Sequence, residues 1–232
     1  MDTGSPPEPA SPTADRLVEA TRDLLWERGY TGTSPKAIQQ RAGAGQGSMY
    51  HHFTGKPDLA LAAITRTAAE LRAVADGLLS GPGTAVERVT AYLRRERDVL
   101  RGCPIGRLTQ DPEVMADPEL RAPVEQTLGW LRGRLAEVLA EGRASGELPP
   151  SVDPSGTAAT VVAVLQGGYV LARAAGGTDP FDQAVTGLIA LLAPPPQPQA
   201  PQPQTPQPQT PQPRNPGTAQ PSNASPKDDG PC

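Results

Sequence analysis

A glycine turn at Gly43, with a short helical segment on either side, constrains the fold of this chain more than any other feature. The segment before the turn begins at Ser34-Pro35, where the serine can cap a helix and the proline needs no backbone donor. After the turn, Met49 and Phe53 stand four residues apart and share one face of a helix. Two short helices joined by a tight glycine-containing turn are typical of a helix-turn-helix, whose second helix enters the major groove of DNA.

A longer amphipathic segment precedes this pair. Thr13 is the expected N-cap, apolar residues recur at helical spacing from Leu17 to Leu25, and Gly29 follows as the stop. The resulting three-helix unit is small, so large rings must supply much of its buried area. Half of the chain's eight aromatic side chains lie in it: Trp26, Tyr30, Tyr50 and Phe53.

Charge is distributed unevenly along the chain. The whole sequence has a formal net charge of −4, but residues 13–56 contain six basic and four acidic side chains. That segment is therefore +2 and the remainder is −6. The asymmetry favours a nucleic-acid-binding module at the front of an otherwise acidic protein.

Several short motifs in this front segment are specific. Residues 29–34 read Gly-Tyr-Thr-Gly-Thr-Ser, residues 41–44 read Arg-Ala-Gly-Ala, and residues 47–53 read Gly-Ser-Met-Tyr-His-His-Phe, followed by Lys56. Together with Ile38, they closely resemble the DNA-binding domain of the TetR/AcrR family of bacterial repressors. The resemblance runs without a gap from Arg16 to about Leu61.

The resemblance implies DNA contacts position by position. Gln46, Gly47 and Ser48 would face base edges, where glutamine can bond adenine and glycine lets the backbone approach. Lys36 would reach a base or a phosphate. The phosphate contacts would come from the following residues: Tyr50, His51, Lys56, Thr33 and Ser34.

The sequence departs from the family at two positions and leaves other interpretations open. Gly45 stands where a capping serine is common, and Gln46 where lysine is common, so specificity cannot be copied from a relative. Tyr50 could instead be a core ring. The pair His51-His52 is not expected to bind metal, because adjacent helical residues point in different directions and the chain has no third histidine. The glycines of residues 43–47 follow a helix rather than a strand, so a nucleotide-binding loop is rejected.

The rest of the ordered chain is predicted to be helical, because apolar residues keep a helical spacing and no alternating strand pattern occurs. Helices are expected from Lys56 to about Leu79, from Thr84 to near Gly102, and from Pro118 to Gly142, with a short segment that begins at residues 103–106 between the last two. Two more are expected from Asp153 to Gly176 and from Asp179 to near Leu192. The fold class is therefore all-α, with about nine helices. The predicted organisation is a disordered arm at 1–12, a helix-turn-helix domain at 13–58, a ligand-binding and dimerisation domain at 59–193, and a disordered Pro/Gln-rich tail at 194–232.

The family resemblance also implies a homodimer that pairs through its last two helices. Gly167, Gly168 and Gly187 would permit close backbone approach there, although a monomer's interior would explain the same residues. A twofold dimer reads two half-sites on double-stranded DNA, so the operator is expected to be pseudo-palindromic.

Two motifs of the body are similar to a subgroup that includes the LmrA/YxaF-type repressors. They are Gly-Cys-Pro-Ile-Gly at 102–106 and Gln-Gly-Gly-Tyr-Val-Leu-Ala-Arg at 166–173. The family arrangement places a ligand pocket among the middle helices. The candidate ligand contacts are Tyr92, Cys103, Gln126, Trp130, Gln166 and Tyr169, although an ordinary core or interface position would explain each of them as well. For Cys103, beside Pro104 and Ile105, a buried inert thiol is favoured over a redox sensor.

Composition indicates the cellular compartment of the protein and the character of the two ends of the chain. Residues 194–232 hold 14 prolines and repeat Pro-Gln-Pro-Gln-Thr, a composition too poor in apolar side chains to form a core. Two cysteines form neither a disulfide framework nor a metal pair, and the acidic N-terminus does not resemble a secretory signal. The uncharged stretch 154–172 is interrupted by polar residues and glycines and is expected to be a buried helix rather than a membrane span. The cytoplasm is the expected compartment.

The sequence as a whole favours a ligand-responsive transcriptional repressor, released from its operator by a small apolar or aromatic effector. A helix-turn-helix activator, or a DNA-binding protein without a small-molecule ligand, is the alternative. An enzyme is not expected, because both histidines lie in the front domain and the body has none for a catalytic triad. No cofactor or metal is predicted.

Overall fold

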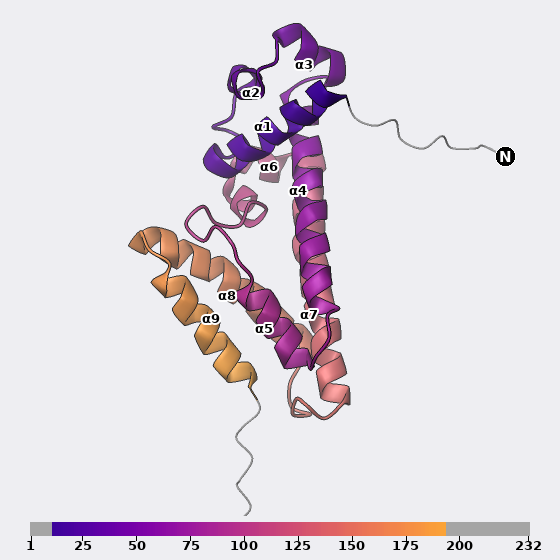
Figure 1. Ribbon diagram of the computed structural model, residues 1–232, viewed down its shortest axis with the longest axis vertical. Helices are drawn as coiled ribbons and strands as arrows, with labels where there is room; N and C mark the ends of the chain where they lie inside the picture. The colour runs from indigo at the N-terminus through magenta and orange to yellow at the C-terminus, as the bar shows by residue number, and fades with distance from the viewer. Residues whose placement is uncertain (1–10, 194–232) are drawn as a thin grey trace, which may run out of the picture. The chain divides into compact units, whose positions relative to one another are not determined.

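The computed structural model describes residues 11–193, and this part of the chain is entirely helical, which confirms the all-α prediction (Figure 1). It contains nine α-helices and one 3₁₀ helix: α1 (Pro12–Arg28), α2 (Pro35–Ala42), α3 (Gln46–His52), α4 (Lys56–Leu79), α5 (Ala85–Arg94), η1 (Gly106–Gln110), α6 (Pro112–Ala116), α7 (Pro118–Ala144), α8 (Pro154–Ala175) and α9 (Asp179–Leu192). The proline-rich tail lies outside the described residues, as does most of the N-terminal arm.

The N-terminus of α1 differs from the prediction. Thr13 is not its cap: the helix begins at Pro12, and the Ser11 hydroxyl accepts a hydrogen bond from the amide of Ala14 at 3.2 Å. Proline fits the first helical turn because its missing amide hydrogen would have no partner there. Ser11 Oγ also lies 3.1 Å from His52 Nε2, so the cap ties the start of α1 to the end of α3.

The second helix follows the prediction closely. The Ser34 hydroxyl accepts from the amide of Ala37 at 3.2 Å, Pro35 occupies the first turn, and Gly43 ends the helix in the left-handed region at φ 59°. Residues with a Cβ rarely adopt that conformation, so the glycine is what permits the turn into α3.

The prediction for α5 was wrong at its C-terminal end. The helix stops at Arg94 rather than near Gly102. The guanidinium of Arg97 turns back and donates to the carbonyl oxygens of Leu93 and Tyr92, each at 2.7 Å. These carbonyls belong to the last turn, where no backbone donor is available, so a side chain from beyond the helix satisfies them.

Two hydrophobic clusters organise the described chain. The first joins α1, α2, α3 and the first half of α4 around fully buried side chains such as Leu17, Ile38, Met49 and Leu59. It continues into η1, whose Leu108 is a buried member, and into α6 and the start of α7. We call α1–α3 the head and α4–α9 the body. The boundary predicted near residue 58 stays a prediction, since α4 and this cluster both cross it.

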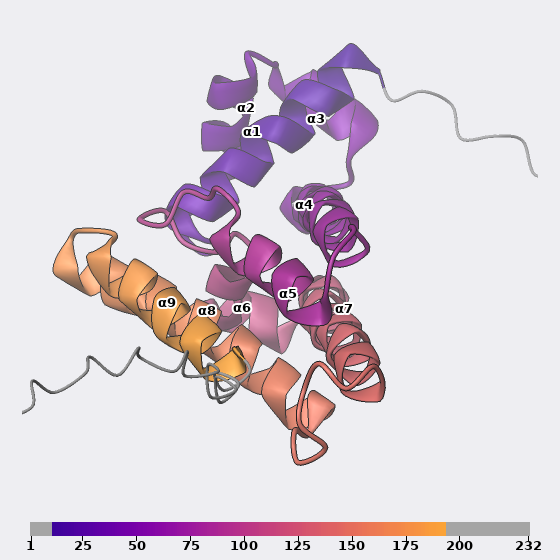
Figure 2. The same ribbon diagram turned by 60° about the horizontal axis from the view of Figure 1, so that its bottom comes forward.

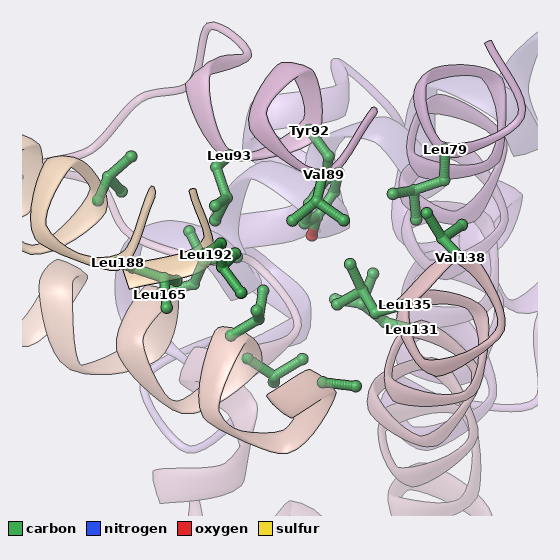
Figure 3. Close-up of a cluster of buried hydrophobic side chains, with 14 of the residues drawn as sticks. Leu79, Val89, Tyr92, Leu93, Leu131, Leu135, Val138, Leu165, Leu188 and Leu192 are labelled. Atoms are coloured by element: carbon green, nitrogen blue, oxygen red, sulfur yellow. The ribbon is translucent and has the colours of Figure 1, made fainter. Parts of the chain in front are cut away.

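The second cluster fills the body between α4, α5, α7, α8 and α9 (Figure 3). Helix α7 packs against both α4 and α8, and α8 packs against α9 (Figure 2). Gly168 of α8 makes the last contact possible, because a Cβ on it would lie 2.9 Å from the ring of Phe181. The neighbouring Tyr169 stacks on that ring, with 4.9 Å between centroids.

Helix α8 alone, among the described helices, is long and apolar enough to cross a membrane on length and composition. Its side chains Val161, Leu165 and Ala172 are buried in the second cluster. A core helix passes the same test, so this packing supports the predicted buried helix.

Candidate nucleic-acid interface and internal cavity

Helix α3 presents its polar residues outward from a single buried anchor. Met49 is fully buried, whereas Gln46 and Gly47 are exposed and Ser48 is half-buried. Tyr50 is 51% exposed, which rules out its interpretation as a core ring. The helix can therefore offer these side chains to a ligand without disturbing the core.

The N-terminus of α3 is open, as the sequence suggests. Gly45 occupies the capping position with φ −74° and ψ 161°, and no side chain accepts a bond from the first amides. A Cβ at Gly45 or Gly47 would meet no atom within 4 Å. Free amides without neighbouring side chains leave room for close approach by another molecule.

The predicted DNA contacts in α2 and just before it differ in how far they are exposed. Lys36 and Ser34 are exposed. Thr33, in contrast, is only 2% exposed, and its hydroxyl donates to the carbonyl of Gly29 at 2.6 Å. The side chain of Thr33 is committed to closing the turn after α1, so the structure removes it from the set that can touch a phosphate.

The remaining candidates lie near the end of α3 and the start of α4. His51 is exposed, and Lys56 is half-buried with its Nζ 3.8 Å from the centre of the Tyr30 ring. This cation–π contact fixes the lysine at the head surface. No group of three potential metal ligands occurs in the described chain, and His51-His52 has no further ligand beside it.

Only part of the basic surplus of the head is available to an anion. Arg22 pairs with Glu19 and Glu70, and Arg41 pairs with Glu27 at 2.8 Å. The other basic residues of the head and of the start of α4 make no ion pair within residues 11–193: Arg16, Arg28, Lys36 and Lys56.

A carboxylate of the body joins it to the head. Asp111, which caps α6, accepts hydrogen bonds from the amides of Tyr30 and Thr31 at 2.7 and 2.9 Å and from the Thr31 hydroxyl at 3.0 Å. Gly29, at φ 75°, admits this carboxylate, since a Cβ there would lie 3.0 Å from Oδ2. Burial alone would raise the pKa of Asp111, but these bonds and one from the Val114 amide outweigh it and lower the pKa.

A cavity of about 350 Å³ lies between the head and the body. Its wall combines Trp26 of α1 with residues of α4, α5, α7, α8 and the loop around Cys103. The Trp26 indole donates to the carbonyl of Gly102 at 2.9 Å, and Arg107 donates to the carbonyl of Trp26 at 2.7 Å. The head therefore forms part of the cavity wall and is bonded to the rest of it.

Five of the six predicted ligand contacts line this cavity: Tyr92, Cys103, Trp130, Gln166 and Tyr169. Gln126 does not; it is exposed, whereas Thr127, Leu128, Trp130 and Leu131 form the stripe of α7 that faces the cavity. Successive helix residues point about 100° apart, so a one-residue difference decides which side of α7 a side chain occupies.

The two subgroup motifs meet in space. Gly106 lies so close to Gln166 that a Cβ on the glycine would collide with the glutamine side chain. Cys103 is half-buried rather than enclosed, accepts from the Gly106 amide at 3.2 Å, and lines both the main cavity and an adjoining one of about 250 Å³. Cys103 is therefore only partly enclosed, and the preference for an inert thiol over a redox sensor stays a prediction.

Sequence reasoning missed several residues of the cavity wall. They are Arg22 and Trp26 of α1, Arg72 of α4, Arg95 and Arg97 after α5, and Thr127 of α7. Burial raises the pKa of Tyr169 to about 12 and that of Tyr92 in the same direction, so both phenols are neutral donors at neutral pH.

An apolar face of α8 and α9 has no partner among the described residues. Val170, Leu171 and Leu191 are 56%, 54% and 85% exposed, and a Cβ at Gly167 or Gly187 would meet nothing within 4 Å. These two glycines face open space, unlike Gly168. The face combines apolar side chains with exposed small residues, a composition that suits close helix packing.

A helix-turn-helix head with an outward-facing α3, bonded to a helical body across a shared cavity, is the architecture of a DNA-binding transcriptional regulator. Residues 17–63 match the family described as bacterial regulatory proteins, tetR family, and residues 83–188 match the tetracyclin repressor-like C-terminal domain. The chain belongs to the TetR family.

Known relatives agree with this assignment. An HTH-type transcriptional regulator encoded in the lacX 3′ region of Lactococcus lactis is 27% identical over 168 residues, covering 69% of this chain and 83% of the relative. The repressor DhaR of a Mycobacterium species is 25% identical and covers 79% and 94%. YxaF of Bacillus subtilis, from the subgroup that the body motifs resemble, is 23% identical over 111 residues, 45% of this chain and 58% of YxaF.

Solved structures share the fold. A TetR regulatory protein from Rhodobacter sphaeroides is 27% identical with a TM-score of 0.69, covering 78% of this chain and 98% of that one. A second, from Chloroflexus aurantiacus, is 29% identical with a TM-score of 0.68, covering 77% and 92%. The regulator CifR, 23% identical with a TM-score of 0.65 and coverage of 80% and 98%, was solved with a 26-bp double-strand operator DNA.

Proposed function

We propose that this protein is a cytoplasmic, ligand-responsive transcriptional repressor that binds a pseudo-palindromic operator as a dimer and releases it when a small effector enters the cavity. The observation that carries the proposal is the cavity wall shared by Trp26 of the head and the helices of the body. A molecule in that space touches the DNA-binding unit directly. The domain at 13–58 would bind DNA, and 59–193 would bind the effector and the second subunit.

DNA contact is assigned to the outward residues of α2 and α3. Gln46, Gly47 and Ser48 would face base edges, and Lys36 would reach a phosphate or a base beside them. The backbone would be held by exposed or cationic groups, which fix the register without reading sequence: Ser34, Tyr50, His51 and Lys56.

Dimerisation is assigned to the unpartnered face of α8 and α9. Its exposed Val170, Leu171 and Leu191 would be covered by the same face of a second copy in a twofold arrangement. Two heads fixed in this way read half-sites one DNA turn apart, about 34–36 Å, or a multiple of it. Relatives named as repressors and the CifR–operator complex support this reading for the family.

Effector release follows from linkage. A ligand that binds better when the heads are placed unfavourably for the operator lowers operator affinity, and operator DNA lowers ligand affinity by the same factor. Trp26, bonded to Gly102 and Arg107, is the element of the head that such a ligand would displace.

A mobility-shift and footprinting assay on DNA flanking the gene tests the proposal. We expect protection of an imperfect inverted repeat. Tyr50→Ala should weaken binding to all sequences, whereas Gln46→Ala should change base preference. Binding to the flanking DNA that is no tighter than binding to competitor DNA would contradict repression. In an in vitro transcription assay, a rise of transcription upon addition of the protein would support the activator alternative.

A further inference from the structure

Three half-buried arginines line the cavity without a carboxylate partner in residues 11–193. Arg72, Arg95 and Arg97 form none of the ion pairs within 4.0 Å. The Nε atom of each is buried and has no hydrogen-bond partner there. Guanidinium groups removed from water normally pair with an anion or satisfy every donor, so three such arginines in one cavity wall are unusual.

The hydrogen bonds that these arginines donate do not neutralise their positive charge. Arg72 donates to the Thr127 hydroxyl at 3.0 Å, and Arg97 donates to the two carbonyls at the end of α5. All of these acceptors are neutral. Burial lowers the pKa of Arg97, and the nearby positive charge of Arg95 lowers it further. An anion in the cavity would favour the charged guanidinium and so oppose this lowering.

The acidic residues of the cavity wall do not compensate for the arginines. Glu19, Asp23, Glu70 and Asp98 are all exposed. The first three are engaged by other arginines, including Arg22 with Glu19 and Glu70. Asp98 accepts from the backbone amide of Arg101. The wall therefore has anionic groups that face solvent and three unneutralised cations that are half-buried.

We infer that the cavity takes a small organic carboxylate, whose anionic group binds among Arg72, Arg95 and Arg97 and whose apolar or aromatic part lies against Trp130 and Leu131. This inference rests on the proposed function and specifies the chemical class of its effector. A planar guanidinium matches the two oxygens of a carboxylate. A volume of about 350 Å³ with aromatic and aliphatic side chains around the arginines suits one acidic group on an apolar skeleton.

Matched pairs of carboxylates and their neutral amides test the inference by calorimetry on the full-length protein. The probes are benzoate with benzamide, 3-phenylpropionate with its amide, and octanoate with octanamide, and phenylphosphonate is added as a different anion. At least one carboxylate is expected to bind about tenfold or more tighter than its amide. Equal affinity within every pair, or no binding by any carboxylate, would overturn the inference. Tighter binding of the phosphonate would replace the carboxylate assignment.

Variants locate the anion. Arg95→Gln and Arg72→Gln should each lower carboxylate affinity about tenfold and leave amide affinity unchanged. Arg94→Gln is the matched control, because Arg94 is exposed in the last turn of α5 and does not line the cavity. An equal loss of carboxylate affinity in Arg94→Gln would mean that net charge alone explains the effect. That result would contradict the proposed site. Two arginine variants are used so that one poorly folded protein does not decide the result.

Operator release separates this inference from the proposed function. If the amides rather than the carboxylates release the operator, the repressor stands and the carboxylate assignment fails. If the protein binds no operator at all, the proposed function fails, and calorimetry still decides whether the cavity prefers carboxylates.

Discussion

The carboxylate of Asp111 accepts a hydrogen bond from the backbone amide of Tyr30 at 2.7 Å, across 81 residues of sequence. The same carboxylate also bonds Thr31 and the amides of Glu113 and Val114. Tyr30 follows α1 in the head and Asp111 precedes α6 in the body. One side chain thus fixes the end of the first helix to the body.

Asp111→Asn should destabilise the protein by about 2 kcal/mol, because the amide nitrogen would face backbone donors that the carboxylate accepts. Urea unfolding measures the loss. Asp117→Asn is the matched control: Asp117 caps α7 through the amides of Glu119 and Leu120 and bonds nothing in the head. The control should cost no more than about 0.5 kcal/mol, because asparagine caps a helix about as well as aspartate does. Equal losses would mean that the bonds to Tyr30 and Thr31 contribute nothing beyond a helix cap.

The same residue predicts a pH dependence. The pKa of Asp111 is lower in the folded protein than its ordinary value of about 4. Its stabilising contribution is therefore full above pH 4 and is lost as the pH falls through the folded value. The difference in unfolding free energy between wild type and Asp111→Asn should be constant from pH 7 to pH 5 and should shrink below pH 4. A difference that grows on acidification would show that the bonds do not favour the charged form.

Gly106→Ala should destabilise the body by no more than about 1 kcal/mol and weaken ligand binding, because the new methyl group forces the flexible end of the Gln166 side chain to shift within the cavity wall. Thermal unfolding and calorimetry measure the two effects. Gly133→Ala is the control, since a Cβ there meets no atom within 4 Å. Adding Gln166→Ala to Gly106→Ala should recover part of the stability. If the double variant recovers no stability, the loss does not come from the contact with Gln166.

Leu191→Glu should convert the proposed dimer to a monomer without unfolding the chain, because the side chain is 85% exposed within one chain and a charge in a paired apolar face is costly. Sedimentation velocity measures the mass, and operator affinity should fall on the order of a hundredfold with the loss of the second half-site. Leu100→Glu, at a 45% exposed leucine outside α8 and α9, is the control. A dimeric Leu191→Glu would exclude this face as the interface.

Lys36→Gln should lower operator affinity and reduce the slope of log affinity against log salt by about 1, as expected for one lost phosphate contact. Arg41→Gln is the control, because Arg41 already pairs with Glu27 and Asp23. Its slope should match the wild type. A changed base preference with an unchanged slope in Lys36→Gln would instead assign this lysine to a base edge.

The sequence predicts those helix ends that local chemistry determines. Ser34 and Pro35 start α2, Gly43 and Gly176 end α2 and α8 in the left-handed region, and α4 has the predicted bounds Lys56–Leu79. Each of these signals acts within one helical turn. The early end of α5 depends on Arg97, which lies beyond the helix, and an apolar pattern that continues past Arg94 conceals it.

For the candidate site, the sequence predicts which side chains of one helix are buried or exposed, but not which helices meet. Exposure of Tyr50 follows from a helix with Met49 as its buried residue. The burial of Thr33, the exposure of Gln126 and the arginines of the cavity depend on which elements pack together. Periodicity does not encode those pairings: nothing in the pattern of α1 indicates that Trp26 reaches a loop 76 residues away.

Both tryptophans of the chain, Trp26 and Trp130, belong to the cavity wall. Indole emission responds to polarity and to nearby quenchers, so the whole intrinsic tryptophan fluorescence of this protein originates at the place where a ligand would enter. Occupancy can therefore be followed by spectroscopy without a label, with one indole on the DNA-binding side of the cavity and the other in the body.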